Sequence, residues 1–540
     1  MSRVLVVTAD VLRTQMAGPA MRAWHIASRL ALENEVRLLT TSPYCEITAD
    51  DFEVAAAGPE ALAEAVSWCE VMVLQGYVTH HHPWLLESDR VIVFDIYDPL
   101  HLETLALTQV SPGPGPVRDA HVRLSVETLN RQLLRADFLM CASERQRDLF
   151  LGQLCALGRV NPLTYDDDPT LRRLIDVVPF GLPDEDPVHR LPALRGVVPG
   201  IRPSDDVIVW AGGVYDWFDP LTVVRAVANL AKRRPSVRLF FMGMRHPNPD
   251  VPEMQVAKKA RALAEELGVA GKHVFFNEGW VSYADRDNFL TEATVGVTAH
   301  FDNAETRFSF RTRCLDYLWA GLPVVTTEGD AFAALVENEG LGFSVPPEDP
   351  DALEEALARL LYDKELAEGC RARAAGVRKL YRWSIVVEVL AEFCRQPRRA
   401  PDLAAGGFVV AGPAPEVAGP APEVVGPAPE MVGPAPEPAA PASPASPGAP
   451  ASPDEGAVRL DGNAAGASSR DNGASASGPG SVPPPPVPTS PPALRPTTLV
   501  ELARHHYREG GFGRVANRAA QKAYRIALGQ DQKPGAKPRT

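Results

Sequence analysis

The chain has 540 residues, of which 45% are hydrophobic, so it is long enough for two to four domains with sizeable cores. Its formal net charge of −14 argues against a general nucleic-acid-binding protein. The seven cysteines include no pair at the CxxC spacing of a zinc or redox site, so we expect reduced thiols in a cytoplasmic protein. The N-terminus has the pattern of a buried strand rather than a signal peptide. No apolar run reaches the roughly 18 residues that span a bilayer.

Up to about residue 397, short apolar runs alternate with helical patterns such as 19–32. In the first half of this region, the predicted strands are 4–7, 35–39, 71–74, 91–94 and 138–141. In the second half they are 207–210, 237–242, 274–276, 295–298, 324–326 and 343–345. Strands that alternate with helices indicate parallel βαβ units. Because the series restarts after residue 183, we predict two Rossmann-like lobes, 1–183 and 184–397, that face a central cleft. Ligands of open parallel sheets bind at the carboxyl ends of the strands, so the cleft is the expected site.

The composition changes after residue 397. Residues 398–494 are rich in Pro and Ala, and four consecutive heptads run from Gly412 to Ala439. At least two prolines per heptad prevent a helix, so we predict a disordered, extended linker. Residues 495–540 carry ten Lys/Arg and three Asp/Glu, a net charge of 10 − 3 = +7, and show two short helical patterns. This basic amphipathic tail binds an anionic membrane surface or an acidic partner, or is solvated.

The most informative stretch is 308–325, FSFRTRCLDYLWAGLPVV. It predicts a short helix that ends at Gly321, a residue suited to a helix C-cap, followed by a strand. Asp316 on this helix is suited to accept hydrogen bonds from ribose hydroxyls, and Arg311 and Arg313 to neutralise a diphosphate. The alternative is an exposed helix with ordinary charges.

The segment from Asp316 to Val325 resembles the signature of family 4 glycosyltransferases, in which a Glu-x7-Glu element leads into a helix ending in Ala-x-Gly-x-Pro-Val-Val. Further matches occur in the family's order along residues 1–395: Gly18 with Pro19 in the N-terminal glycine loop, Gly212 with Gly213 in the loop that opens the donor lobe, and Trp383 with the crossing helix. The resemblance implies a GT-B fold and a nucleoside diphosphate sugar as donor. It also implies retention of anomeric configuration, with no obligatory metal and no other cofactor.

The chain departs from the family pattern before this helix. Asp316 replaces the second Glu, and the first Glu falls at Phe308, which cannot form a hydrogen bond through its side chain. Glu305, three residues earlier, is a candidate substitute. The basic pair that usually follows the lobe-opening glycines is missing, so our hypothesis is that Arg311 and Arg313 supply the phosphate charge instead.

Four further residues are site candidates. His80 belongs to a histidine triplet that we expect in a loop after a strand; it contacts the sugar or acceptor, or is solvated. Adjacent histidines do not converge on one ion and no carboxylate cluster accompanies them, so we expect no metal site. Asp98 follows another strand and is suited to position or deprotonate an acceptor hydroxyl, or to cap a helix. In the second lobe, Trp280 stacks on the nucleobase or packs in the core, and Arg245 lines the pyrophosphate.

The sequence therefore predicts a glycosyltransferase that moves a sugar from a nucleoside diphosphate sugar to a cell-surface polysaccharide or glycolipid acceptor. We expect it in the cytoplasm, with the basic tail as a means of reaching the inner face of the cell membrane. One alternative is a non-catalytic scaffold of the same fold, tethered through its linker. Another is a sugar-nucleotide epimerase or a phosphorylase.

Overall fold

The computed structural model describes residues 1–110, 113–249 and 251–407. Apart from the first residues of the predicted linker, both the linker and the basic tail lie outside the described residues. Among the helices that the structure describes, none is long and apolar enough to cross a membrane.

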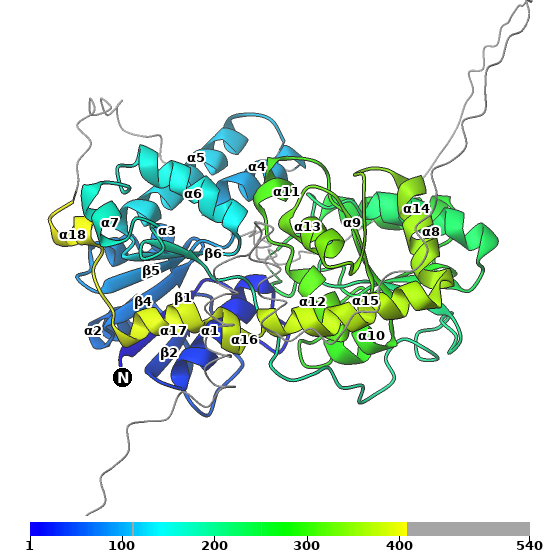
Figure 1. Cartoon of the computed structure of the whole chain (residues 1–540), viewed down its shortest axis with the longest axis horizontal. Helices are drawn as coiled ribbons and strands as arrows, with labels where there is room; N and C mark the ends of the chain where they lie inside the picture. The colour runs from blue at the N-terminus through cyan, green and yellow to red at the C-terminus, as the bar shows by residue number, and fades with distance from the viewer. Residues whose placement is uncertain (111–112, 250, 408–540) are drawn as a thin grey trace, which may run out of the picture. The chain divides into compact units, whose positions relative to one another are not determined.

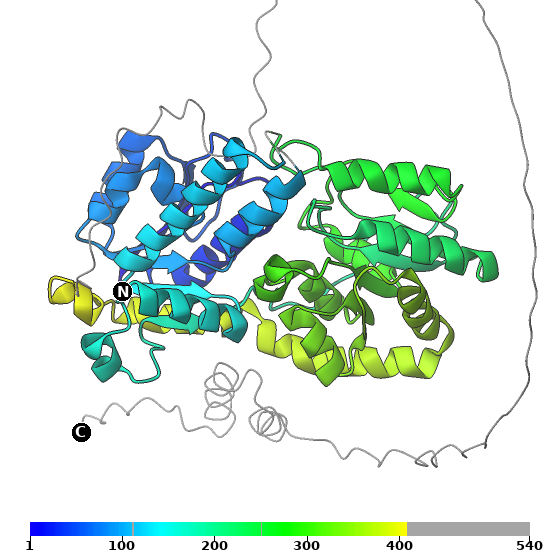
Figure 2. The same cartoon turned by 90° about the horizontal axis from the view of Figure 1, so that it is seen from above.

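The first lobe is built on a seven-stranded parallel sheet with the order β3-β2-β1-β4-β5-β6-β7. Its strands are β1 (Arg3–Thr8), β2 (Glu35–Thr40), β3 (Glu53–Ala56), β4 (Val71–Gln75), β5 (Val91–Asp95), β6 (Phe138–Cys141) and β7 (Ile175–Val177). Its helices are α1 (Gly18–Ala31), α2 (Pro59–Trp68), α3 (Val78–His81), the short 3-10 helix η1 (Pro83–Glu87), α4 (Leu100–Val110), α5 (Pro116–Arg135), α6 (Glu144–Ala156) and α7 (Pro162–Asp167). Helices lie on both faces of the sheet (Figures 1 and 2), which is why its inner strands β1 and β4 each contain a continuous run of four buried apolar residues, Val4–Val7 and Val71–Leu74.

The second lobe repeats this plan with a six-stranded parallel sheet in the order β10-β9-β8-β11-β12-β13. Its strands are β8 (Asp206–Trp210), β9 (Val237–Phe241), β10 (Val274–Phe276), β11 (Val295–Thr298), β12 (Val324–Thr327) and β13 (Gly342–Val345). Its helices are α8 (Pro220–Arg233), α9 (Gln255–Glu266), α10 (Arg286–Glu292), α11 (Ala304–Phe308), α12 (Thr312–Ala320), α13 (Ala331–Asn338), α14 (Pro350–Tyr362), α15 (Lys364–Val377) and the short 3-10 helix η2 (Arg378–Tyr381). The predicted fold class of two Rossmann-like parallel-sheet lobes is confirmed.

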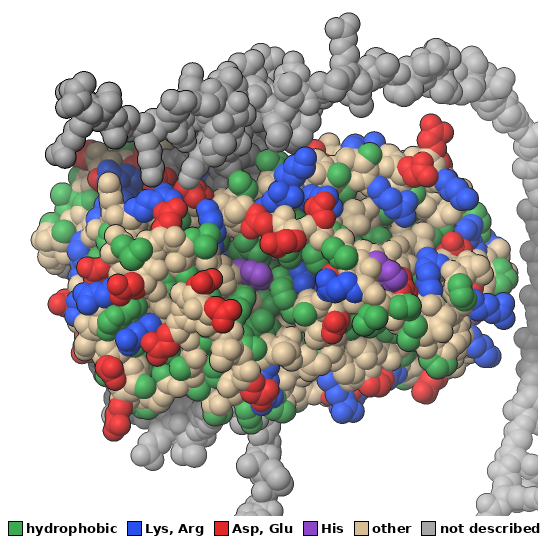
Figure 3. Space-filling model, turned by 90° about the horizontal axis from the view of Figure 1, so that it is seen from below, with side chains coloured by type: hydrophobic (Ala, Val, Ile, Leu, Met, Phe, Trp, Pro, Cys, Tyr) green, Lys and Arg blue, Asp and Glu red, His purple; other side chains and the backbone are tan. Residues whose placement is uncertain are grey.

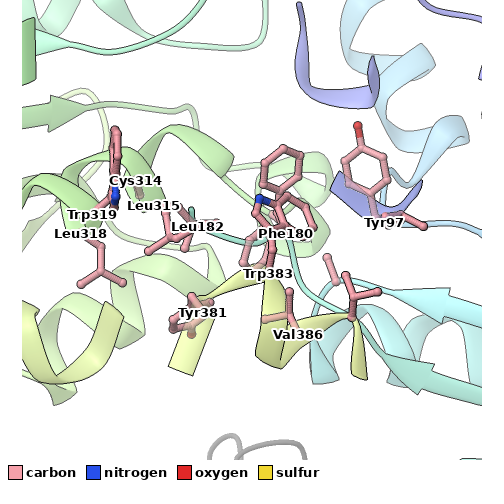
Figure 4. Close-up of a cluster of buried hydrophobic side chains, with 14 of the residues drawn as sticks. Tyr97, Phe180, Leu182, Cys314, Leu315, Leu318, Trp319, Tyr381, Trp383 and Val386 are labelled. Carbon is pink, nitrogen blue, oxygen red and sulfur yellow. The ribbon is translucent and has the colours of Figure 1, made fainter. Parts of the chain in front are cut away.

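The last described helices, α16 (Trp383–Val386), α17 (Glu388–Arg395) and α18 (Pro401–Ala404), return to the first lobe. The Ser2 hydroxyl donates to the Cys394 carbonyl at 2.7 Å. The Trp383 indole lies against Gly181, where a Cβ would come within 2.4 Å of the ring. Figure 4 shows Trp383 and Phe180 between Tyr97 of the first lobe and Trp319 of the second. One hydrophobic cluster thus includes side chains from both lobes.

Two local predictions differ from the structure. The edge strands β3 and β7 were not predicted, because both are short and β3 is half exposed. The expected loop at the histidine triplet is wrong, because Val78–His81 form a helical turn. Gln132 holds this turn by donating to the Gly76 carbonyl at 2.7 Å and to the Thr79 hydroxyl at 3.1 Å.

Candidate donor-binding site

The glycine loop after β8 forms one wall of the candidate site. Gly212 has φ +79°, a left-handed conformation that favours glycine, and a Cβ at this position would lie 3.9 Å from the Cβ of Arg313. Gly213 and Gly243 both face the indole of Trp280, which a Cβ would approach to 3.0 Å and 2.9 Å respectively. Trp280 therefore packs on the backbone of the two loops that follow β8 and β9.

A small pocket opens beside this indole at the carboxyl ends of β8 and β9. Tyr215, His246 and Trp280 contribute rings to its wall, and Arg245 contributes an exposed guanidinium. Tyr215 stacks on Trp217 with a centroid distance of 4.9 Å. Glu253 also lines the pocket and pairs with Arg261 at 2.8 Å. The enclosed space is only about 10 Å³, enough for one water molecule, so these aromatic surfaces can contact a flat ring only at the mouth of the pocket.

Arg311 and Glu305, both candidate residues, form a buried ion pair with each other. The Arg311 guanidinium donates to both carboxylate oxygens of Glu305, at 2.9 Å and 2.6 Å, and to the Thr306 hydroxyl at 3.1 Å. Both residues are at most 5% exposed. Glu305 also accepts from the Ser309 hydroxyl at 2.5 Å. The Nε of Arg311 has no hydrogen-bond partner but lies 3.9 Å from the Asp330 carboxylate. Two carboxylates therefore balance the charge of Arg311 and leave it little capacity for an anion.

Arg313, in the first turn of α12, has no such partner. Its guanidinium lies 4.0 Å from the ring centroid of Phe218 and 5.0 Å from that of Trp210. Its Nη1 has no hydrogen-bond partner, and no carboxylate of a described residue lies within ion-pair distance. Burial lowers the pKa of Arg313 to about 10, so the side chain is still charged at neutral pH. A buried cation with unused donors, beside a helix N-terminus that has no side-chain cap, is arranged to bind an anion.

Asp316 lies one turn further along α12, and the helix ends at Gly321 with φ +67°, confirming the predicted C-cap. The Asp316 carboxylate accepts from Nε of Arg286 at 3.1 Å through Oδ1. Sequence reasoning did not single out Arg286, because nothing in the chain marks a residue 30 positions earlier as a neighbour of Asp316.

In the first lobe, Asp98 and Glu103 lie within electrostatic range of Glu305 on α11. Helix α4, which carries Glu103, packs against α11. Burial raises the pKa of Asp98 to about 7, with the charges of Asp95 and Glu305 acting in the same direction. Burial, followed by the charges of Asp98 and Glu305, raises the pKa of Glu103 well above its ordinary value. Asp98 therefore titrates near neutral pH, as a proton-accepting group in a site would. Glu103 was not predicted, because no motif in helix α4 marks it as a site residue.

Known proteins resemble this chain in sequence and in fold. Residues 205–363 match the family described as Glycosyl transferases group 1. A phosphatidyl-myo-inositol mannosyltransferase of Mycolicibacterium smegmatis is 28% identical over 164 residues, which are 30% of this chain and 38% of that protein. A D-inositol 3-phosphate glycosyltransferase of Jonesia denitrificans is 25% identical over 319 residues, 57% of this chain and 68% of that protein.

Solved structures show the same fold. Sucrose-phosphate synthase of Thermosynechococcus elongatus superposes with a TM-score of 0.53 at 16% identity, covering 75% of this chain and all of that one. The described residues thus have the two-lobed GT-B fold, and the second lobe matches a glycosyltransferase family. Anabaena HepE in complex with UDP-glucose has a TM-score of 0.51 at 14% identity, covering 73% of this chain and all of that one.

Two candidate residues of the first lobe, Gly18 and His80, lie in different surroundings. Gly18 begins α1, and a Cβ at this position would lie 3.6 Å from the Tyr97 hydroxyl. Tyr97 directly precedes the candidate residue Asp98. His80 is half-buried on α3, with its ring 5.0 Å from that of His81 and with Glu127 and Arg131 of α5 as charged neighbours. No hydrogen bond or ring contact among the described residues joins His80 to the second lobe. Within the same residues no group of His, Cys, Asp and Glu is arranged to hold a metal ion.

Proposed function

We propose that this glycosyltransferase moves a sugar from a nucleoside diphosphate sugar to a hydroxyl acceptor, with Arg313 as the principal ligand of the diphosphate. The observation that carries the proposal is the buried guanidinium of Arg313, whose Nη1 has no partner. Its side chain leaves the first turn of α12 beside Gly212, and the guanidinium lies against the rings of Phe218 and Trp210. A buried unpaired cation costs stability, and a bound anion would remove that cost.

In this proposal each residue has a distinct task. Arg313 and the first N–H groups of α12 stabilise the charge that develops on the leaving diphosphate. Asp316 holds the ribose through its second oxygen, since Oδ1 is engaged by Arg286. Trp280, with Arg245 at the rim, borders the place of the nucleobase and pyrophosphate. Asp98 positions or deprotonates the acceptor hydroxyl. Transfer then requires no metal ion and no further cofactor, and we propose that it retains the anomeric configuration.

Similar proteins support the choice of substrates. Anabaena HepE forms a complex with UDP-glucose, and one relative is named as a transferase to phosphatidyl-myo-inositol. We therefore propose a nucleoside diphosphate sugar as donor and a cell-surface polysaccharide or a glycolipid as acceptor. Nucleic acid is not proposed as a partner. On the face shown in Figure 3, acidic and basic side chains are interspersed and form no continuous basic surface.

Calorimetric titration with UDP, GDP and ADP tests the donor site directly. The proposal expects one of these nucleotides to bind and the matching nucleotide sugar to be hydrolysed slowly without an acceptor, equally well after EDTA treatment. NMR of the product then reports the anomeric configuration. If no nucleoside diphosphate binds, the rival function gains support: a non-catalytic scaffold of the same fold. A product that is an isomer of the sugar nucleotide, or a sugar phosphate, would instead indicate an epimerase or a phosphorylase.

The location of the enzyme is a separate proposal: a cytoplasmic protein that reaches the inner face of the membrane through the basic tail, 495–540. Its test compares the full chain with a chain ending after Gly407 for binding to vesicles of phosphatidylglycerol and phosphatidylcholine. The end point matters, because Asp402 pairs with buried Arg159 at 2.6 Å and belongs to the folded body. The shortened chain should keep donor hydrolysis and lose vesicle binding. Equal vesicle binding by both chains would contradict a role for the tail.

A further inference from the structure

Arg286, the first residue of α10, is held on all sides by groups of the donor lobe. Its Nε donates to Asp316 at 3.1 Å and its Nη1 donates to the Tyr283 carbonyl at 2.6 Å. One contact of the guanidinium is the ring of Tyr283, at 3.5 Å from the centroid, and another is the ring of Trp319, at 4.4 Å. Only 8% of the residue is exposed. A planar cation fixed by two hydrogen bonds and two rings has one available orientation, and that orientation sets where the Asp316 carboxylate lies.

Tyr283 connects this cation to the first lobe. Its hydroxyl forms a hydrogen bond of 2.8 Å with Nε2 of His25 on α1, and its backbone N–H donates to the Thr14 carbonyl at 3.3 Å. The His25 ring in turn stacks on Trp383 of α16, with centroids 4.8 Å apart and an interplanar angle of 13°. A continuous series of contacts therefore runs from Asp316 through Arg286 and Tyr283 to the crossing segment of the chain.

The contact between Tyr283 and His25 is between uncharged groups. Burial, helped by the charge of Arg286, lowers the pKa of His25 to about 3. Burial also raises the pKa of Tyr283, so its hydroxyl keeps its proton at neutral pH. The bond between the lobes therefore persists across the physiological range and depends on position rather than on protonation.

We propose that Arg286 is a positioning residue that orients Asp316 toward the donor ribose and, through Tyr283 and His25, couples donor binding to the contact between the two lobes. The inference rests on the proposed function, because it assumes that Asp316 meets the ribose. A ligand that fixes Asp316 also restrains Arg286 and its stacked partner Tyr283. Donor binding then strengthens the contact of Tyr283 with the first lobe. By linkage, this contact strengthens donor binding by the same factor.

Two conservative variants separate this role from mere packing. Tyr283→Phe keeps the ring on Arg286 and removes only the hydroxyl that meets His25. Arg286→Lys keeps the charge but cannot hold two acceptors in a fixed geometry between two rings. Tyr165→Phe on α7 and Arg307→Lys on α11 are the matched controls, because both side chains are exposed.

The measurements are the Kd of the nucleoside diphosphate that the wild type binds, the KM of the sugar nucleotide, kcat and the urea midpoint. We expect Tyr283→Phe to weaken nucleotide binding about two- to tenfold, the range of one neutral hydrogen bond, and to raise KM with little change in kcat. Arg286→Lys should weaken binding by at least tenfold, and His25→Gln should add nothing to Tyr283→Phe.

Wild-type affinity in folded Tyr283→Phe, or additive losses in the double variant, would overturn the coupling. Wild-type affinity in Arg286→Lys would overturn the positioning role. Failure of the wild type to bind any nucleoside diphosphate would be a different result, because it would refute the proposed function and this inference with it.

Discussion

Arg313→Met removes the charge of the proposed phosphate ligand while keeping an unbranched side chain in place of the arginine stem. The change should have opposite effects on binding and on stability. In the folded protein, Nη1 of Arg313 is buried without a partner, a state that costs about 1–3 kcal/mol. Its contacts with the rings of Phe218 and Trp210 return about 0.5–2 kcal/mol. These terms nearly cancel, so we expect the free energy of unfolding to stay within about 1 kcal/mol of wild type, or to rise.

Binding should respond much more strongly. A hydrogen bond between charged groups contributes about 1.5–3 kcal/mol, and about 1.4 kcal/mol corresponds to a tenfold change in affinity. Arg313→Met should therefore weaken binding of the nucleoside diphosphate roughly ten- to hundredfold. The nucleoside alone, which lacks phosphates, should bind as it does to the wild type.

Calorimetry with the nucleoside and its diphosphate measures the first effect, and urea unfolding measures the second. Arg307→Met is the matched control, because Arg307 is exposed on α11 and should leave both quantities unchanged. A variant that binds the diphosphate like wild type but loses several kcal/mol of stability would show that Arg313 is a structural residue, and the reasoning would fail.

Three further changes test single contacts. The rate of transfer should fall as pH decreases through about 7, because Asp98 must be ionised to accept a proton. Asp98→Asn should be slow with a flat pH profile, and a variant with the wild-type pH profile would refute the role of Asp98 as proton acceptor. Arg159→Met leaves Asp402 buried without its ion pair and should lower the free energy of unfolding in urea by about 3–5 kcal/mol, a loss that adding Asp402→Leu should partly recover. An unchanged free energy of unfolding in Arg159→Met would show that the pair is dispensable. Gly296→Ala places a Cβ 2.4 Å from the ring of Tyr317 and should cost about 1–3 kcal/mol by the same assay, so a wild-type midpoint would contradict the packing argument.

Local patterns in the sequence were sufficient for the architecture. Buried parallel strands are continuous apolar runs, so β1, β4 and β8 stand out whatever surrounds them. The end of α12 was equally readable, because Gly321 adopts the left-handed conformation that favours glycine. Strands β3 and β7 were missed because short edge strands carry too few residues to show a period.

Only part of the candidate site could be predicted from the sequence. The motif around Asp316 indicated which helix approaches the donor, and the two arginines before it were singled out together. Their difference was not visible: Arg311 is neutralised by Glu305, whereas Arg313 has no ionic partner among the described residues. Two arginines only two positions apart in sequence therefore differ in their ability to bind an anion, because different side chains surround them in the folded protein.

The sequence by itself determined the two-lobed plan, the change of composition after residue 397 and the helix that carries Asp316, because each depends on residues close together in the chain. Tertiary structure alone decided that Arg286 meets Asp316 and that Tyr283 meets His25, 258 residues away. Such pairs follow from how two sheets and their loops pack. The energy of a buried charge depends on every neighbour it has, and most of those neighbours are distant in sequence.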